Sequence, residues 1–186
     1  MTLWPVLVAC VPAGLSGMLF ESTIESAVRT RPLMIGIATI ALGLLLLAAD
    51  RLGKRRRAMH EVRLSDWVII GLAQALAIFP GVSRSGITIT AALFCGLERE
   101  ASARFSFLLG APIILGAGLF KLKDLFEVGL PASQVMPFVL GVVTATVVGY
   151  LCIGFLLGYL RKRSMGSFVA YRMVFGGAVI LLALLR

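Results

Sequence analysis

Long apolar runs separated by short charged loops constrain the fold of this chain more than any other feature of its sequence. A membrane-crossing helix needs about 20 consecutive apolar residues. Of the 186 residues, 59% are apolar and only 15% charged, against roughly 25% charged in soluble domains. We therefore predict an all-α integral membrane protein with about five transmembrane helices, over residues 3–20, 32–49, 103–120, 136–160 and 171–185.

A sixth apolar stretch, residues 67–97, is interrupted at its centre by the sequence PGVSRSG at 80–86. Each flank has roughly 13 residues, which would rise about 20 Å as a helix. That is shorter than a hydrocarbon core of about 30 Å. Irregular backbone at membrane depth is tolerated only beside protein or a wet cavity. The pattern therefore predicts a re-entrant hairpin of two half-helices.

The charge pattern predicts the orientation of the chain. Net charge is +9, from 18 Lys+Arg and 9 Asp+Glu, and the basic residues gather in the short loops 51–63 and 161–163. Cytoplasmic loops carry such an excess, so we favour this explanation over a nucleic-acid partner. Loops 21–31 and 121–134 would then face outward, with Met1 on the cytoplasmic side and Arg186 outside.

The break at 80–86 has the chemistry of an anion site. Gly81 permits a tight turn, and Ser83 and Ser85 are good N-cap residues for the following helix. A helix N-terminus attracts anions, Arg84 offers a fork of donors suited to phosphate, and Thr88 could add a hydroxyl. An arginine at membrane depth costs at least about 2.5 kcal/mol and normally has a partner or a wet cavity. The alternative is a purely structural break, with Arg84 reaching the cytoplasmic surface.

Other polar residues give weaker signals. Gln74, in the first half-helix, could hydrogen-bond a ligand or the second half-helix, or it could serve in helix packing alone. His60, in the basic loop, is expected to be solvated. Glu21 and Glu25 could share a helix face, but a solvated helix end is favoured over a metal site. The three cysteines show no metal-binding spacing and are expected to be small buried side chains.

The string GLAQALAIFPGVSRSGITITAALFCGLEREASARFSFLLGAPIILGAG resembles the second signature region of bacterial undecaprenyl-diphosphate phosphatases of the bacitracin-resistance type. VPAGLSGMLFESTIES and FVAYRMVFGG resemble the middle section and last helix of that family. The resemblance implies an inverted-repeat, transporter-like fold whose site opens to the outer face. It also implies a catalytic pair, Ser83 and Arg84, supported in substrate binding by Ser85, Gly81, Thr88 and Gln74.

The resemblance implies an activity that removes the terminal phosphate of undecaprenyl diphosphate. The product would be undecaprenyl phosphate, the lipid carrier of cell-wall glycans, and the activity would give bacitracin resistance. The partners would be this polyprenyl diphosphate and membrane lipids in the bacterial inner membrane, with no nucleic acid; a homodimer is compatible. A lipid-phosphate carrier or flippase that does not hydrolyse its ligand is the alternative, and a non-catalytic membrane protein with a structural break is the third.

The chain departs from the family in one respect. The first signature, two glutamates four apart followed by Pro-Val-Ser-Ser-Thr-Gly-His, is absent. We expect the first hairpin and one helix to be missing before Met1, together with the ligands of the divalent metal (Mg or Ca) that the family implies. The chain would then be a single membrane domain: 1–63 ends the first repeat and includes the basic loop, and 64–186 is the second repeat with hairpin 67–97. Whether the chain is active alone stays open.

Overall fold

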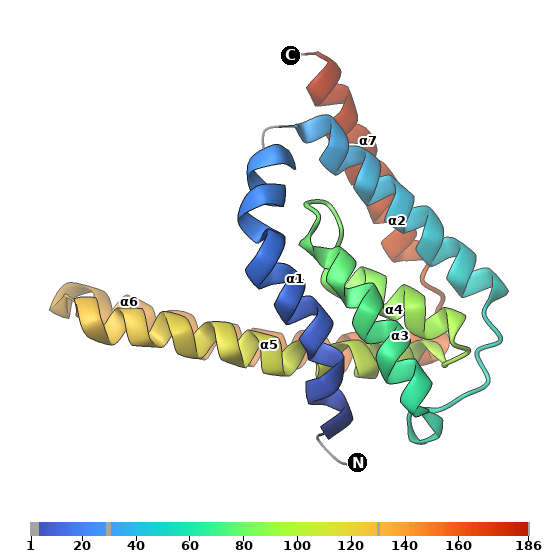
Figure 1. The fold of residues 1–186 in the computed structure, drawn as a ribbon, viewed down its shortest axis with the longest axis horizontal. Helices are drawn as coiled ribbons and strands as arrows, with labels where there is room; N and C mark the ends of the chain where they lie inside the picture. The colour runs from blue at the N-terminus through green and yellow to red at the C-terminus, as the bar shows by residue number, and fades with distance from the viewer. Residues whose placement is uncertain (1–3, 29–30, 130, 186) are drawn as a thin grey trace.

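The computed structural model describes residues 4–28, 31–129 and 131–185, and these form helices joined by short loops (Figure 1). Within these ranges there is no strand beyond one isolated bridge between Arg57 and Leu97, so the predicted all-α class is confirmed. The helices are α1 (Trp4–Val28), α2 (Pro32–Leu52), η1 (Met59–Glu61), α3 (Leu64–Ala75), η2 (Leu76–Ile78), α4 (Arg84–Phe94), α5 (Arg99–Val128), α6 (Ala132–Lys162) and α7 (Gly166–Leu184).

Four of the described helices are long and apolar enough to cross a membrane: Pro32–Leu52, Arg99–Lys123, Ser133–Lys162 and Gly166–Leu184. The first expected span is present as a shorter apolar helix, Trp4–Phe20. The predicted loops 21–31 and 121–134 were wrong in extent, because α1 continues to Val28 and α5 to Val128. Glu21 and Glu25 therefore belong to the last turns of α1, and their side chains lie outside the described residues. Hydropathy marks where an apolar run ends, whereas a helix continues as long as its backbone hydrogen bonds do.

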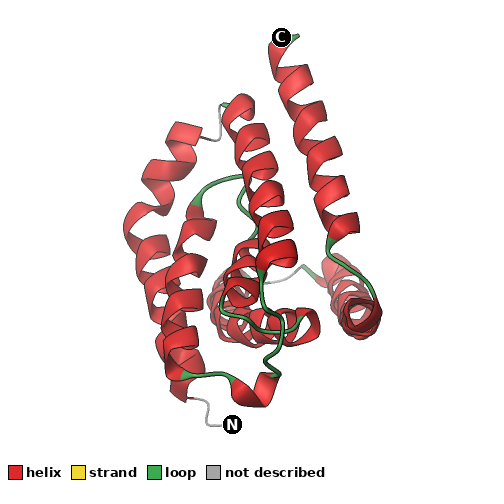
Figure 2. Cartoon of the chain, turned by 90° about the vertical axis from the view of Figure 1, so that its right-hand side faces the viewer, coloured by secondary structure: helices red, strands yellow, loops and turns green. Residues whose placement is uncertain are grey.

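Small residues allow the helices to approach closely in two pairs. A Cβ on Gly36 of α2 would lie 3.0 Å from the carbonyl oxygen of Gly176 on α7, and the reverse distance is also 3.0 Å. A Cβ on Gly71 of α3 would lie 2.6 Å from the carbonyl oxygen of Ala9 on α1. Close backbone approach at small residues is the usual basis of helix packing in membranes. Figures 1 and 2 accordingly show α2 beside α7 and α1 beside α3, whereas α5 and α6 run across the other helices.

The predicted helical hairpin over 67–97 is confirmed as α3–η2 followed by α4, which pack against each other. Gly81, in the loop between them, has φ of +93°, and its added Cβ would lie 2.6 Å from the carbonyl oxygen of Ile35 on α2. Thr39 of α2 donates a hydrogen bond to the Gly81 carbonyl at 3.4 Å. A side chain would be both strained and obstructed at Gly81, so this glycine lets the tip of the hairpin rest on α2.

The basic segment after α2 is folded onto the other end of the hairpin. Arg57 pairs with Asp66 at the start of α3 and donates to the carbonyl of Cys95 at the end of α4. His60 is exposed, as expected. This segment lies at the end of the hairpin opposite to the loop between η2 and α4 (Figure 1).

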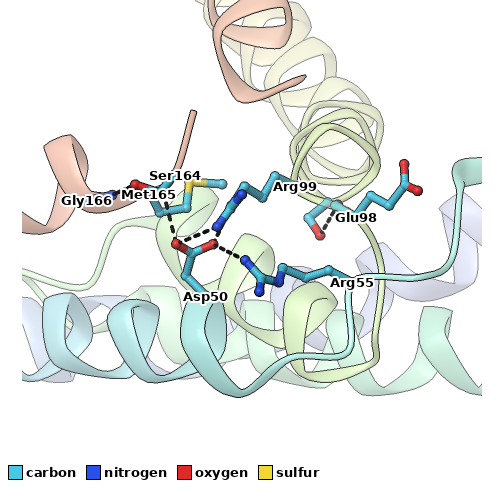
Figure 3. A network of polar contacts seen from close by, with 8 residues as sticks. Asp50, Arg55, Glu98, Arg99, Ser164, Met165 and Gly166 are labelled. Atoms are coloured by element: carbon cyan, nitrogen blue, oxygen red, sulfur yellow. Dashed lines mark hydrogen bonds and ion pairs between the residues drawn. The ribbon is translucent and has the colours of Figure 1, made fainter. Parts of the chain in front are cut away.

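Asp50, buried near the end of α2, contacts α5, the start of α7 and the loop after α2 (Figure 3). Its carboxylate accepts two hydrogen bonds from Arg99 of α5, at 2.5 and 3.2 Å, and one from the backbone N–H of Met165 at the start of α7. Arg55 lies 4.0 Å from the same carboxylate. Asp50 therefore fixes the ends of α2, α5 and α7 relative to one another.

Candidate anion-binding site

The N-terminus of α4 is capped as the sequence predicts. Ser83 is the N-cap residue, with φ −74° and ψ 128°, and its Oγ accepts a hydrogen bond from the N–H of Gly86 at 3.2 Å. Ser85 lies in the first turn of α4 rather than at the cap, with its Oγ 3.3 Å from the Oγ of Ser83. The two hydroxyls thus lie side by side at the positive end of the helix dipole.

Arg84 lines a cavity of about 250 Å³ enclosed by residues of α1, the hairpin and α5: Ala13, Ser16, Gly17, Gln74, Ala77, Ile78 and Ile113. The side chain is half-buried and has no hydrogen-bond or ion-pair partner among the described residues. Its Nη2 would lie 3.9 Å from a Cβ on Gly110 of α5. The cationic group faces a cavity, as the anion hypothesis requires.

Gln74 lines the same cavity and is only 1% exposed. Neither its amide nitrogen nor its amide oxygen has a hydrogen-bond partner in the described part of the chain. Of the three roles that the sequence left open, a hydrogen bond to the second half-helix is therefore not seen. Buried amides are normally hydrogen-bonded, so an unpartnered amide beside an unpaired arginine indicates a place for a polar ligand.

The structure separates the predicted residues into two groups. Gly81 and Ser83 line a second cavity, of about 360 Å³, on the α2 and α7 side of the loop, together with Arg172. Ser83 and Ser85 line a third, of about 120 Å³, again with Arg172. Arg84 and Gln74 therefore lie on one side of the α4 N-terminus, and the serines lie on the other.

Arg172 of α7 is a residue that the sequence analysis missed. It approaches α4 so closely that a Cβ on Gly86 would lie 2.9 Å from its Nη2. No hydrogen bond or ion pair neutralises it within the described ranges. The sequence did contain a signal for this residue, because Arg172 lies within an apolar run. An arginine there normally has a partner or faces a wet cavity, as argued for Arg84.

Thr88 lies in the interface between α4 and α5 rather than on a cavity. It is 1% exposed, and its hydroxyl is 2.7 Å from the Oγ of Ser106 on α5. It also donates to the Arg84 carbonyl at 2.9 Å. These contacts support a packing role for Thr88.

Potential metal ligands do not gather in the part of the chain that the structure describes. No group of three or more His, Cys, Asp or Glu side chains is found there, and a divalent cation held by protein ligands alone needs about that many. The divalent metal that the resemblance implies stays a prediction.

Comparison with known proteins decides the family. The family model of the bacitracin resistance protein BacA matches residues 1–178. This chain belongs to the BacA family. Among the proteins similar to this chain are three that are named undecaprenyl-diphosphatase. That of Pelobacter propionicus is 49% identical over 175 residues, covering 94% of this chain and 64% of the relative. Those of Moorella thermoacetica and Pelotomaculum thermopropionicum are 48% and 49% identical over 98% of this chain, covering 68% and 67% of their own lengths.

This BacA chain thus spans about two thirds of the length of the relatives it matches. The family and the apolar helices together make it a multi-pass, all-α integral membrane protein. Within it, the hairpin α3–α4 places Arg84 and the buried amide of Gln74, both without a partner among the described residues, on one side of the capped α4 N-terminus.

Proposed function

We propose that this chain binds undecaprenyl diphosphate in the bacterial inner membrane and supports hydrolysis of its terminal phosphate, yielding undecaprenyl phosphate. The observation that carries the proposal is the cavity that Arg84 shares with the buried, unpartnered amide of Gln74. The names of the relatives support the choice of this lipid.

The proposed roles follow from charge and position. Arg84 holds the diphosphate and offsets the negative charge that develops as the phosphorus–oxygen bond breaks. Gln74 donates from its amide to a phosphate oxygen, and Ser83 and Ser85 place hydroxyls at the helix N-terminus. Gly81 shapes the loop that presents them. A supporting role for Thr88 requires that its hydroxyl leave Ser106.

One observation favours the second candidate, a lipid-phosphate carrier. The residues that line the three cavities around the α4 N-terminus include no carboxylate and no imidazole in the described part of the chain. Proton transfer to and from a reacting group usually falls to such side chains. An anion cradle without a base suits binding and movement of a lipid phosphate as well as it suits hydrolysis.

The test is phosphate release from undecaprenyl diphosphate in detergent, measured beside equilibrium binding of the same lipid. We expect Arg84→Ala to reduce release by about 10²–10³-fold, as loss of one preorganised donor does elsewhere. Arg84→Lys should recover part of it, because it keeps the charge without the fork. Arg51→Ala, at an exposed arginine near the end of α2, is the matched control and should behave as wild type.

The three functions give different results in this assay. Release that depends on Arg84 supports the phosphatase. Tight, Arg84-dependent binding without release supports the carrier. Unchanged binding and release in Arg84→Ala contradict both and leave the break at 80–86 as structural. Adding Mg²⁺ or Ca²⁺ to each reaction tests the predicted dependence on a divalent metal, and mass measurement of the detergent complex tests the homodimer.

A further inference from the structure

We propose that the third cavity binds the first isoprene segment of the lipid whose phosphates occupy the α4 N-terminus. This inference rests on the proposed function and names the part of the site that would recognise a prenyl chain. The cavity has a polar end, made by Ser83, Ser85 and Arg172, and otherwise apolar walls. The apolar walls come from five helices and include Leu46, Ile89, Phe107, Leu156 and Phe168.

The direction of the cavity follows from the helices that line it. On α4, Ile89 lies one turn beyond Ser85, and on α7 the lining residues run from Arg172 through Phe168 to Met165. Seven residues of helix rise about 10 Å. The cavity therefore leads away from the anion site along α4 and α7, toward the junction where Asp50 contacts Met165.

The chemistry of this arrangement fits a prenyl diphosphate. In the proposed site the diphosphate spans the α4 N-terminus, with its terminal phosphate at Arg84 and Gln74. The phosphate that carries the prenyl chain would then lie at Ser83 and Ser85, where it faces the helix dipole and Arg172. The first carbons of the chain need an apolar path away from this charge. The wall beside the serines supplies that path. The cavity has only about 120 Å³, so it would take a short segment at the head of the chain and leave the remainder to the bilayer.

The position of Gly86 supports a common site for the diphosphate and the first isoprene segment. Its missing side chain lets Arg172 Nη2 approach the first turn of α4, where a Cβ would lie at 2.9 Å. Leu42 of α2 also packs there, with its Cδ2 3.2 Å from that Cβ position. The guanidinium thus lies between the capped helix end and the apolar walls. In the proposed complex, the junction between the diphosphate and the prenyl chain would lie at this position.

The test fills the cavity and compares ligands with and without a prenyl chain. Ile89→Phe adds bulk to the wall, and Ile69→Phe makes the same change at a half-exposed position on α3. Binding of farnesyl diphosphate, undecaprenyl diphosphate and inorganic pyrophosphate is measured in detergent. We expect Ile89→Phe to weaken both prenyl ligands by about 10–200-fold, the range by which an apolar pocket discriminates small changes of shape. Pyrophosphate binding should change less than about 3-fold, and Ile69→Phe should leave all three unchanged.

Failure of this inference is distinct from failure of the proposed function. Suppose that wild type binds all three ligands, and that Ile89→Phe either weakens all three equally or weakens none of them. The prenyl site is then wrong, while the anion site stands. If wild type does not bind pyrophosphate or prenyl diphosphates at all, both proposals are wrong. Binding without release contradicts hydrolysis alone.

A second measurement on the wild-type chain avoids any dependence on a variant that folds poorly. A farnesyl diphosphate analogue with a photoreactive group on its first isoprene should label peptides containing Leu156, Met165 or Phe168. Labelling confined to the exposed surface of α6, for example at Leu151, would overturn the inference. So would labelling of the same peptides by a photoreactive phosphatidylglycerol that excess farnesyl diphosphate does not displace.

Discussion

Replacing Gln74 by Met should make the ligand-free protein more stable and the anion site weaker. The amide is 1% exposed, and both its polar atoms lack partners in the described residues. A buried polar group without a hydrogen bond costs about 1–3 kcal/mol. Met has a similar length and no such group, so the free energy of unfolding should rise by about that amount. In a chain of this size, each kcal/mol corresponds to about 2–4 °C in Tm.

The effect on ligand binding should have the opposite sign. A hydrogen bond to a charged group contributes about 1.5–3 kcal/mol, so loss of the amide should weaken pyrophosphate or lipid diphosphate binding about 10- to 100-fold. At a ligand concentration of about 100 Kd, wild type gains about 2.7 kcal/mol of stability. At the same concentration a 10- to 100-fold weaker Kd leaves about 1.4 to 0.4 kcal/mol, so Gln74→Met should lose between about half and five sixths of that gain.

Thermal unfolding in detergent, with and without pyrophosphate, measures both effects in one experiment. Gln134→Met makes the same chemical change at an exposed glutamine on α6 and should alter neither quantity. A lower Tm for ligand-free Gln74→Met would show that the amide is satisfied by the protein. An unchanged affinity would show that it does not face the anion, and either result would refute the reasoning.

Two further changes test the scaffold, again by unfolding in detergent. Gly81→Ala should destabilise the protein by at least about 1–2 kcal/mol, because φ is +93° and a Cβ would meet backbone. Gly116→Ala, with open space around it, should be neutral or stabilise by about 0.5–1 kcal/mol, and equal effects of the two changes would contradict the strain argument. Asp50→Asn should cost about 1.5–3 kcal/mol through loss of its charged hydrogen bonds to Arg99, whereas Glu127→Gln, in an exposed ion pair, should change stability by less than about 0.5 kcal/mol.

Part of the candidate site was predictable because it depends on residues close together in the chain. Pro80 and Gly81 interrupt the apolar stretch, and Ser83 caps the helix that begins at Arg84. Such breaks and caps are formed by hydrogen bonds and dihedral preferences within a few residues. The existence of the hairpin and the position of its loop could therefore be predicted without coordinates.

The direction of each side chain could not be predicted in the same way. The sequence placed Arg84, Ser83 and Thr88 in one motif, yet they face a cavity beside α1, a cavity beside α7 and the α5 interface, respectively. Arg172 joins the serines from a helix far along the chain. Which neighbour covers which face of a short helix depends on the packing of distant elements, which local pattern does not encode.

The sequence alone determined that this chain is a helical membrane protein with a broken, anion-attracting hairpin, because apolar length, Pro and Gly positions and helix capping act over short distances. Only the tertiary structure decided that Gln74 would have no partner among the described residues, that Gly86 would admit Arg172, and that an apolar cavity would begin at the serines. Those features arise where helices from different parts of the chain meet, and close packing there fixes which polar groups remain free for a ligand.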